Sequence, residues 1–385
     1  MTRLTTAGQY TLLCIASLTI MVGSVVAPGL ISIATGLGIT ENSVLLITLP
    51  ALGAVLFAPI AGKVIDRYGA YPSLMIGLFL YGLIGASVYL LHGPTHVFAN
   101  RILLGGVTAI VMAACTVLIS QWYFGHERLG MIAKQGMAIE LGGVIFLFVG
   151  GLLAAQYWGL PLAIYLLAWL FLVMLVCLVP RNHQAEPKDE NPIIDTVQQV
   201  GMSLKAVYLI AVLAMVIFFT STVSLPLVLH ERHYSEEEVG ILLAFISMVA
   251  VITAHFLPKM TGKLGEQNTL LVAFIGLGIS YMCFIQPNYF VSWLGAVASG
   301  IGFGFSIPLL NHMTVERSPL AVRGRNLSYF TMAVFSGQFL TSFVEYIPGD
   351  LTNVYKLNVI TCVIIAVVLF ITGKKGMASK VAEAQ

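Results

Sequence analysis

The sequence has few charged residues. Only 9% of its 385 residues are Asp, Glu, Lys or Arg, whereas 58% are hydrophobic. A soluble domain has about a quarter charged residues, so this chain lacks the polar surface that water requires on all sides. Its net charge of +2 is also too small to indicate nucleic-acid binding. The composition therefore excludes a water-soluble protein and predicts one whose solvent is the lipid bilayer.

Clustered cysteines and nucleotide-binding motifs are also missing. Each cysteine lies in a different apolar run without C-x-x-C spacing, which argues against a disulfide framework or a zinc site. No G-x-x-x-x-G-K-[ST] motif occurs, so we expect the energy for any work to come from an ion gradient. The histidines are scattered too. We therefore expect no enzymatic activity, no cofactor and no metal. The cysteines are Cys14, Cys115, Cys177, Cys283 and Cys362.

Twelve apolar runs are long enough to cross a bilayer, because a spanning helix needs about 20 predominantly apolar residues. The runs are continuous rather than alternating, which excludes strands. A polar stretch at 181–199 divides them into two groups of six. We predict an all-α membrane protein in which two six-helix pseudo-repeats surround a central cavity. Its parts are an N-terminal half at 1–180, a cytoplasmic linker at 181–204, a C-terminal half at 205–373 and a cytoplasmic tail at 374–385. The runs cover residues 9–35, 43–62, 70–92, 97–121, 129–156, 160–180, 205–229, 239–258, 268–286, 288–313, 326–347 and 352–373.

The distribution of basic residues predicts the orientation. With both termini in the cytoplasm, all lysines and arginines except Arg101, Arg232 and Lys356 fall at the cytoplasmic side. We predict a multi-pass protein of the plasma (bacterial inner) membrane. The short loops indicate no partner protein, so we expect a monomer that interacts with the bilayer, protons and a small-molecule substrate.

A weak internal repeat links the two halves. The segment GKVIDRYG at 62–69 matches PKMTGKLG at 258–265 with an offset of 196 residues. The offset aligns Arg67 with Lys263 and Gly69 with Gly265. The halves are therefore related in parallel orientation, an arrangement that places a substrate site between repeats near the membrane midplane.

This organisation resembles the major facilitator superfamily over essentially the whole chain. That family has a G-x-L-x-D-R-x-G-R-R signature between its second and third helices. The resemblance implies that Asp66 and its partner Arg67 close the cytoplasmic side when the cavity faces outward. The alternative is a positive-inside anchor beside a chance acid. Ala70 and Tyr71 replace the usual basic residues, and Gly262 replaces the acid in the second half, so we expect a one-sided gate. The signature is present as Gly62, Val64, Asp66, Arg67 and Gly69.

Two further segments are similar to motifs of the same family. RILLGG contains Arg101 and Gly105 in the R-x-x-x-G pattern of proton-coupled members. ELGGVIFLFVGG matches the end of the antiporter pattern G-x-x-x-G-P-x-x-G-G at Gly150 and Gly151, but Phe146 and Leu147 occupy the Gly-Pro positions. The chain thus resembles drug:proton antiporters, but the antiporter motif in its fifth predicted span lacks the Gly-Pro pair.

Glu140 is the candidate proton site. At about 1.5 Å per residue, it lies roughly 16 Å from the cytoplasmic start of its helix, near the midplane. Burial favours the protonated carboxyl, whereas a nearby Arg101 would favour the ionised one. A conformational change that separates and rejoins the two groups would couple protons to transport. The alternative is a static ion pair that only fixes helix packing.

Polar and aromatic residues of runs 205–229, 288–313 and 326–347 are expected to line the cavity, although any single aromatic could serve packing alone. Lys134 could bind an anionic group or act as a cytoplasmic anchor. We predict proton-coupled export of small amphiphilic molecules by alternating access. The alternative is proton-coupled uptake, or facilitated transport, of an organic acid or amino-acid-like compound. The predicted lining residues are Phe218, Phe219, Thr222, Phe305, Tyr329, Gln338 and Lys134.

Overall fold

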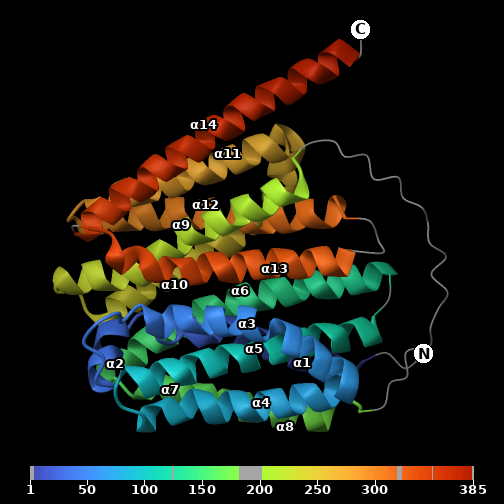
Figure 1. The fold of residues 1–385 in the computed structure, drawn as a ribbon, viewed down its shortest axis with the longest axis vertical. Helices are drawn as coiled ribbons and strands as arrows, with labels where there is room; N and C mark the ends of the chain where they lie inside the picture. The colour runs from blue at the N-terminus through green and yellow to red at the C-terminus, as the bar shows by residue number, and fades with distance from the viewer. Residues whose placement is uncertain (1–3, 124, 182–201, 319–322, 349, 384–385) are drawn as a thin grey trace. The chain divides into compact units, whose positions relative to one another are not determined.

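The computed structural model describes residues 4–123, 125–181, 202–318, 323–348 and 350–383, and all regular structure in these ranges is helical (Figure 1). Within them, twelve helices are long and apolar enough to cross a membrane. The prediction of an all-α protein with twelve spans is confirmed. The predicted linker at 181–204 falls mostly on residues outside the described ranges.

The chain divides into two units. One comprises Met1–Asp189 and Leu229–Ala244, and the other comprises Glu190–Val228 and Phe245–Gln385. The helices up to residue 181 all belong to the first unit. They are α1 (Thr6–Ser24), α2 (Leu30–Gly36), α3 (Leu45–Tyr68), α4 (Ala70–Ser87), α5 (Pro94–Trp122), α6 (Gly125–Gln156), α7 (Leu160–Ala163) and α8 (Leu167–Leu178), with 3-10 turns at Val88–Leu90 and Ile164–Leu166.

The first apolar run differs from its prediction. The sequence pattern is continuous over 9–35, yet α1 ends at Ser24 and α2 begins at Leu30. Pro28 explains the break, because proline has no backbone N–H to donate and disfavours helical geometry at the residue before it.

The second half of the chain contains six long helices. Two of them, α9 and α10, contribute residues to both units. The helices are α9 (Leu204–Glu231), α10 (Glu236–His255), α11 (Leu257–Ile285), α12 (Tyr289–Glu316), α13 (Arg323–Leu340) and α14 (Leu351–Glu383), with a 3-10 segment at Thr341–Tyr346.

The repeat found in the sequence is present in the backbone. Gly69 has φ 85° and ψ 159° between α3 and α4, and Gly265 has φ 80° and ψ 164° at a kink within α11. A positive φ favours glycine, which explains why the aligned positions share this residue. The agreement supports the prediction of two pseudo-repeats.

Small residues bring equivalent helix pairs into close contact in both halves. A Cβ on Gly53 of α3 would lie 2.0 Å from the carbonyl oxygen of Ile102, and one on Gly105 of α5 would lie 1.9 Å from that of Pro50. In the other unit, a Cβ on Gly304 of α12 would lie 2.5 Å from the carbonyl oxygen of Ala250 on α10. Membrane helices associate through such small residues because lipid supplies no hydrophobic driving force between them.

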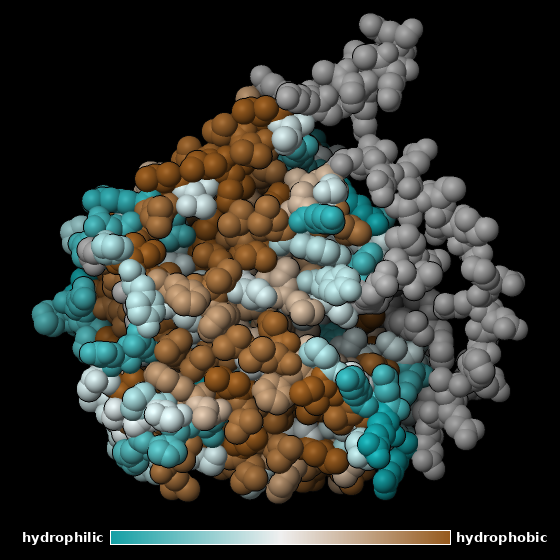
Figure 2. Space-filling model, viewed as in Figure 1, coloured by the Kyte–Doolittle hydropathy of each residue, from teal (hydrophilic) through white to brown (hydrophobic). Residues whose placement is uncertain are grey.

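The outer helix faces are apolar. Figure 2 shows hydrophobic residues gathered along the middle of the helices and hydrophilic residues toward their ends. On α4 and α8, for example, Ile76 is 57% exposed and Val173 is 60% exposed. Such surfaces are suited to contact with acyl chains.

Candidate functional site

The most deeply buried cation in the described part of the chain is Arg101 in α5, whose residue exposure is 1%. Its Nη1 donates to the hydroxyl of Tyr165 at 3.1 Å, and its Nη2 donates to Oδ1 of Asn100 at 3.1 Å. The guanidinium carbon also lies 5.3 Å from the centre of the Tyr165 ring. The Nε atom has no hydrogen-bond partner among the described residues.

Tyr165 and Asn100 are held in place by further bonds. The Tyr165 hydroxyl donates to the carbonyl oxygen of Val22 at 2.7 Å, and Asn100 Nδ2 donates to that of Ile84 at 2.9 Å. These three residues, Arg101, Asn100 and Tyr165, form what we call the arginine cluster. No carboxylate contacts the guanidinium among the described residues, so dipoles and a ring face offset its charge. A buried cation balanced in this way is energetically costly.

Glu140 lies in α6 and is half-buried. Arg101 and Glu140 are both described, and no ion pair joins them in this conformation, in which the guanidinium bonds to Tyr165 and Asn100. A neighbouring polar contact was missed from the sequence: the nearly buried Gln135 donates from Nε2 to Oγ1 of Thr116 on α5 at 3.0 Å. The proposed coupling between Arg101 and Glu140 remains a prediction.

The predicted gate segment forms the exposed end of α3. Asp66 and Arg67 are both exposed, and among the described residues neither takes part in an ion pair. The Arg67 guanidinium carbon lies 5.4 Å from the ring centre of Tyr68. The amide of Gly69 donates to the carbonyl oxygen of Ile65 at 2.8 Å and ends the helix. A Cβ on Gly62 would meet nothing within 4 Å.

The equivalent turn in the second half has an ion pair that we did not predict. Glu266 follows Gly265, and its Oε2 lies 2.6 Å from Nη2 of Arg317 at the end of α12. The Nε of Arg317 also donates to the carbonyl oxygen of Met202 at 2.9 Å, just before α9. The sequence signal was weak because the two residues are 51 positions apart.

The two glycines that end the antiporter pattern, Gly150 and Gly151, lie in α6, and each is in close contact with another segment of the first unit. A Cβ on Gly150 would lie 2.7 Å from the carbonyl oxygen of Val25, and one on Gly151 would lie 2.8 Å from the Cα of Gly240. Neither position leaves room for a side chain. The eroded Gly-Pro positions, Phe146 and Leu147, are buried.

The predicted lining residues differ in burial. Phe218 is buried and stacks on Phe303 of α12, with ring centres 3.8 Å apart. This contact indicates that Phe218 packs against a neighbouring helix, the alternative role left open for the aromatic residues. Phe305 is also buried, whereas Phe219, Thr222 and Gln338 are half-buried and Tyr329 and Lys134 are exposed. Among the described residues, no group of three His, Cys, Asp or Glu side chains could hold a metal ion.

The chain has similar sequences among bacterial transporters. It is 23% identical over 332 residues to the multi-drug resistance efflux pump PmrA of Streptococcus pneumoniae, covering 82% of each chain. It is 25% identical over 315 residues to multidrug resistance protein 2 of Bacillus subtilis, covering 75% of this chain and 76% of that protein.

Solved structures have the same fold. The nucleoside transporter NupG superimposes with a TM-score of 0.75 at 13% identity, covering 95% of this chain and 99% of that one. A D-xylose–proton symporter superimposes with a TM-score of 0.70 at 18% identity, covering 94% and 95%. A model of the Major Facilitator Superfamily matches residues 12–342. With its twelve candidate spans, the chain is a multi-pass membrane protein and belongs to the Major Facilitator Superfamily, a family of transporters rather than an enzyme class.

Proposed function

We propose that this transporter exports small amphiphilic molecules in exchange for protons, by alternating access in a bacterial inner membrane. Efflux relatives over three quarters or more of the chain support export. The mixture of aromatic and polar side chains among the candidate lining residues supports an amphiphilic substrate. The gate segment at 62–69 supports a cycle in which one side closes while the other opens.

The observation that carries the proton-coupling step is the position of Glu140. This carboxyl is half-buried within the membrane-spanning part of α6, which extends over Lys134–Gln156. A carboxyl that moves between a wet and a dry environment changes its preferred protonation state, because burial disfavours the ionised form. Among the described residues, no cation forms an ion pair with Glu140 in this conformation.

Arg101 would act in the other part of the cycle. The hydrogen bonds of the arginine cluster hold the guanidinium in position. Only a rearrangement of α5 against α6 would bring the guanidinium closer to Glu140. Such an approach would favour release of the proton, since a cation stabilises the carboxylate. Lys134, which is exposed near the start of the α6 span, would serve as a second cation that attracts substrates with an anionic group.

The first experiment uses purified protein in liposomes with an internal pH dye and an imposed proton gradient. Lipophilic cations, organic acids and amino acids are added one at a time. Proton flux triggered by lipophilic cations is the expected result. Flux triggered only by acids or zwitterions would favour the metabolite alternative. Substrate movement without proton flux would contradict proton coupling.

The alternative has one observation in its favour. Residues of this chain also align with the hexuronate transporter of Bacillus subtilis at 21% identity over 272 residues. An acidic substrate would be attracted by Arg101 and Lys134. In the liposome panel, this alternative predicts that hexuronate-like acids trigger flux and lipophilic cations do not.

A further inference from the structure

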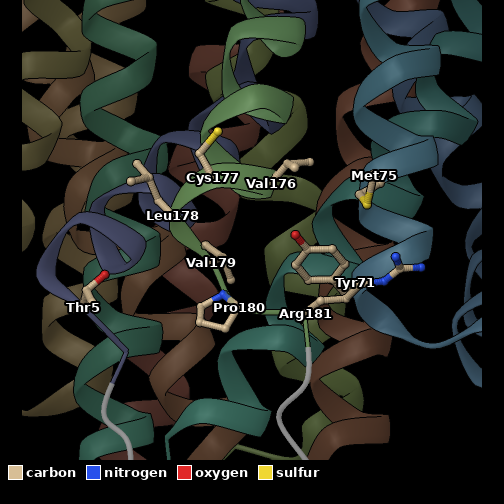
Figure 3. Close-up of a pocket in the computed structure, with 9 residues that line it drawn as sticks. All are labelled: Thr5, Tyr71, Met75, Val176, Cys177, Leu178, Val179, Pro180 and Arg181. Atoms are coloured by element: carbon tan, nitrogen blue, oxygen red, sulfur yellow. The ribbon is translucent and has the colours of Figure 1, made fainter.

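One pocket of the first unit lies away from the candidate transport residues. It has a volume of about 470 Å³ and is lined by residues of three segments: the start of α1, the first turns of α4, and the end of α8 with the chain that follows it (Figure 3). The lining residues include neither the arginine cluster nor Glu140. They are Thr5, Tyr71, Met75, Val176, Cys177, Leu178, Val179, Pro180 and Arg181.

The pocket combines an apolar wall with a polar edge. Met75 and residues 176–180 form the wall. Figure 3 shows Thr5 on one side, and Tyr71 and Arg181 close together on the other. No acidic residue lines the pocket, and Arg181 makes no ion pair among the described residues. Within the described part of the chain, the positive charge of Arg181 therefore has no acidic partner at this pocket.

Two hydroxyl groups add hydrogen-bonding capacity beside this charge. Thr5 Oγ1 accepts from the amide of Gly8 at 3.1 Å, which leaves its own proton available to donate. The Tyr71 hydroxyl donates to the carbonyl oxygen of Leu175 over a long distance of 3.3 Å, so it can turn to a better acceptor. Thr5 also caps the positive end of the α1 dipole. All these features favour an anion with several acceptor oxygens.

The position relative to the bilayer identifies the source of that anion. Thr5 precedes the span Thr6–Ser24, Tyr71 begins the span Ala70–Leu90, and Arg181 follows the span Leu160–Leu178. The polar edge thus lies where the spans meet water. The apolar wall continues into exposed side chains on the same two helices, with Ile76 57% exposed on α4 and Val176 53% exposed on α8.

We propose that this pocket binds an anionic phospholipid of the surrounding bilayer. The headgroup phosphate bonds to Arg181 and the two hydroxyls, and the start of an acyl chain lies along Met75 and residues 176–180. An arginine near a membrane surface attracts anionic lipids. The proposal is independent of the transported substrate and of proton coupling, because it concerns only the outer face of one unit.

The test measures lipid binding to the purified full-length chain by native mass spectrometry. Phosphatidylglycerol and phosphatidylcholine with identical acyl chains are offered in equal amounts, and the ratio of bound species is recorded. We expect Arg181→Gln to lower the preference for phosphatidylglycerol about fivefold, the effect of losing one surface cation. The matched control is Lys205→Gln, which removes an exposed cation at the start of α9 that does not line the pocket, and it should lower the preference much less than Arg181→Gln.

A second variant tests the apolar wall. Met75→Trp fills the pocket without changing charge and should reduce the amount of both bound lipids, with thermal stability measured alongside to confirm folding. Equal preference for phosphatidylglycerol in the Arg181→Gln variant and the unsubstituted protein would overturn the proposal. Displacement of the lipid by excess glycerol 3-phosphate would also overturn it, because it would show a site for soluble phosphates.

Discussion

Arg101 shows how a membrane protein can keep a cation in its interior. Tyr165 provides both a hydroxyl at 3.1 Å and a ring face at 5.3 Å, and its own proton is donated to Val22. Two hydrogen bonds and one aromatic ring replace the water that the guanidinium loses on burial. The loss of either bond would leave a buried charge poorly compensated, so the cluster should be sensitive to small changes.

We predict that Tyr165→Phe destabilises the protein by about 1.5–3 kcal/mol, because a hydrogen bond to a buried charge is lost. The control is Tyr81→Phe, which removes a neutral bond of 2.6 Å to the carbonyl oxygen of Leu18. A neutral bond between membrane helices contributes on average about 0.6 kcal/mol. Unfolding of both variants in mixed micelles provides the comparison. Equal losses would mean that the Arg101 bond adds nothing.

Glu140 allows a functional prediction. A carrier that exchanges one proton per substrate can build a substrate gradient of about tenfold for each unit of pH difference, since both correspond to about 1.4 kcal/mol. We expect Glu140→Gln to abolish this pH-driven accumulation, because an amide cannot release a proton, while substrate exchange without a gradient persists. Liposome uptake assays with and without a pH difference provide the measurement. Undiminished pH-driven accumulation in the variant would exclude Glu140 as the proton site.

Between helices, several glycines allow backbones to approach closely. On α3 and α5, Gly53 and Gly105 each face a carbonyl oxygen of the opposite helix. On α10 and α12, Gly304 has the same role toward Ala250. Since lipid is as apolar as the side chains, contact of backbones at short range provides the association energy. The same device in both halves is consistent with their origin as a repeat.

We predict that Gly105→Ala destabilises the first unit by about 1–3 kcal/mol, the usual cost of overpacking. Its Cβ would lie 1.9 Å from the carbonyl oxygen of Pro50, so α3 and α5 must move apart. The matched control is Gly136→Ala in α6, where a Cβ would meet nothing within 4 Å. That change should be neutral or stabilising by up to about 1 kcal/mol. Thermal unfolding of the two variants distinguishes them, and an unchanged Gly105→Ala midpoint would contradict the packing.

At the scale of the whole molecule, an even number of spans lies between corresponding loops of the two halves. Together with the positive-inside rule, this predicts that such loops lie on the same side of the membrane. We expect Lys63→Cys and Lys263→Cys to react with a membrane-impermeant maleimide only from the cytoplasmic side. Glu41→Cys and Glu237→Cys should react only from the opposite side. The background must lack the five native cysteines. Labelling of intact cells and inside-out vesicles provides the test, and labelling of Lys63→Cys and Lys263→Cys from different sides would contradict an even number of intervening spans.

The number of spans, the helical class and the duplication could be predicted from the sequence, because each depends on local or periodic information. A run of about 20 apolar residues specifies a membrane helix regardless of its neighbours. The glycines at 69 and 265, which the sequence repeat aligns, share a positive φ in the structure. The break after Ser24 was also encoded locally, in Ala27-Pro28-Gly29, although the continuous apolar pattern concealed it.

The partners of individual polar side chains depended on the tertiary structure. Arg101 bonds to Tyr165, 64 positions away, and Arg317 to Glu266, 51 positions away. No spacing rule predicts such pairs, because they depend on how far each helix is shifted and rotated against the next. The sequence could thus show that Arg101 needed compensation in the membrane. Only the tertiary structure, which brings Tyr165 of the turn at Ile164–Leu166 within hydrogen-bond distance of Arg101, decided that a tyrosine rather than Glu140 provides it in this conformation.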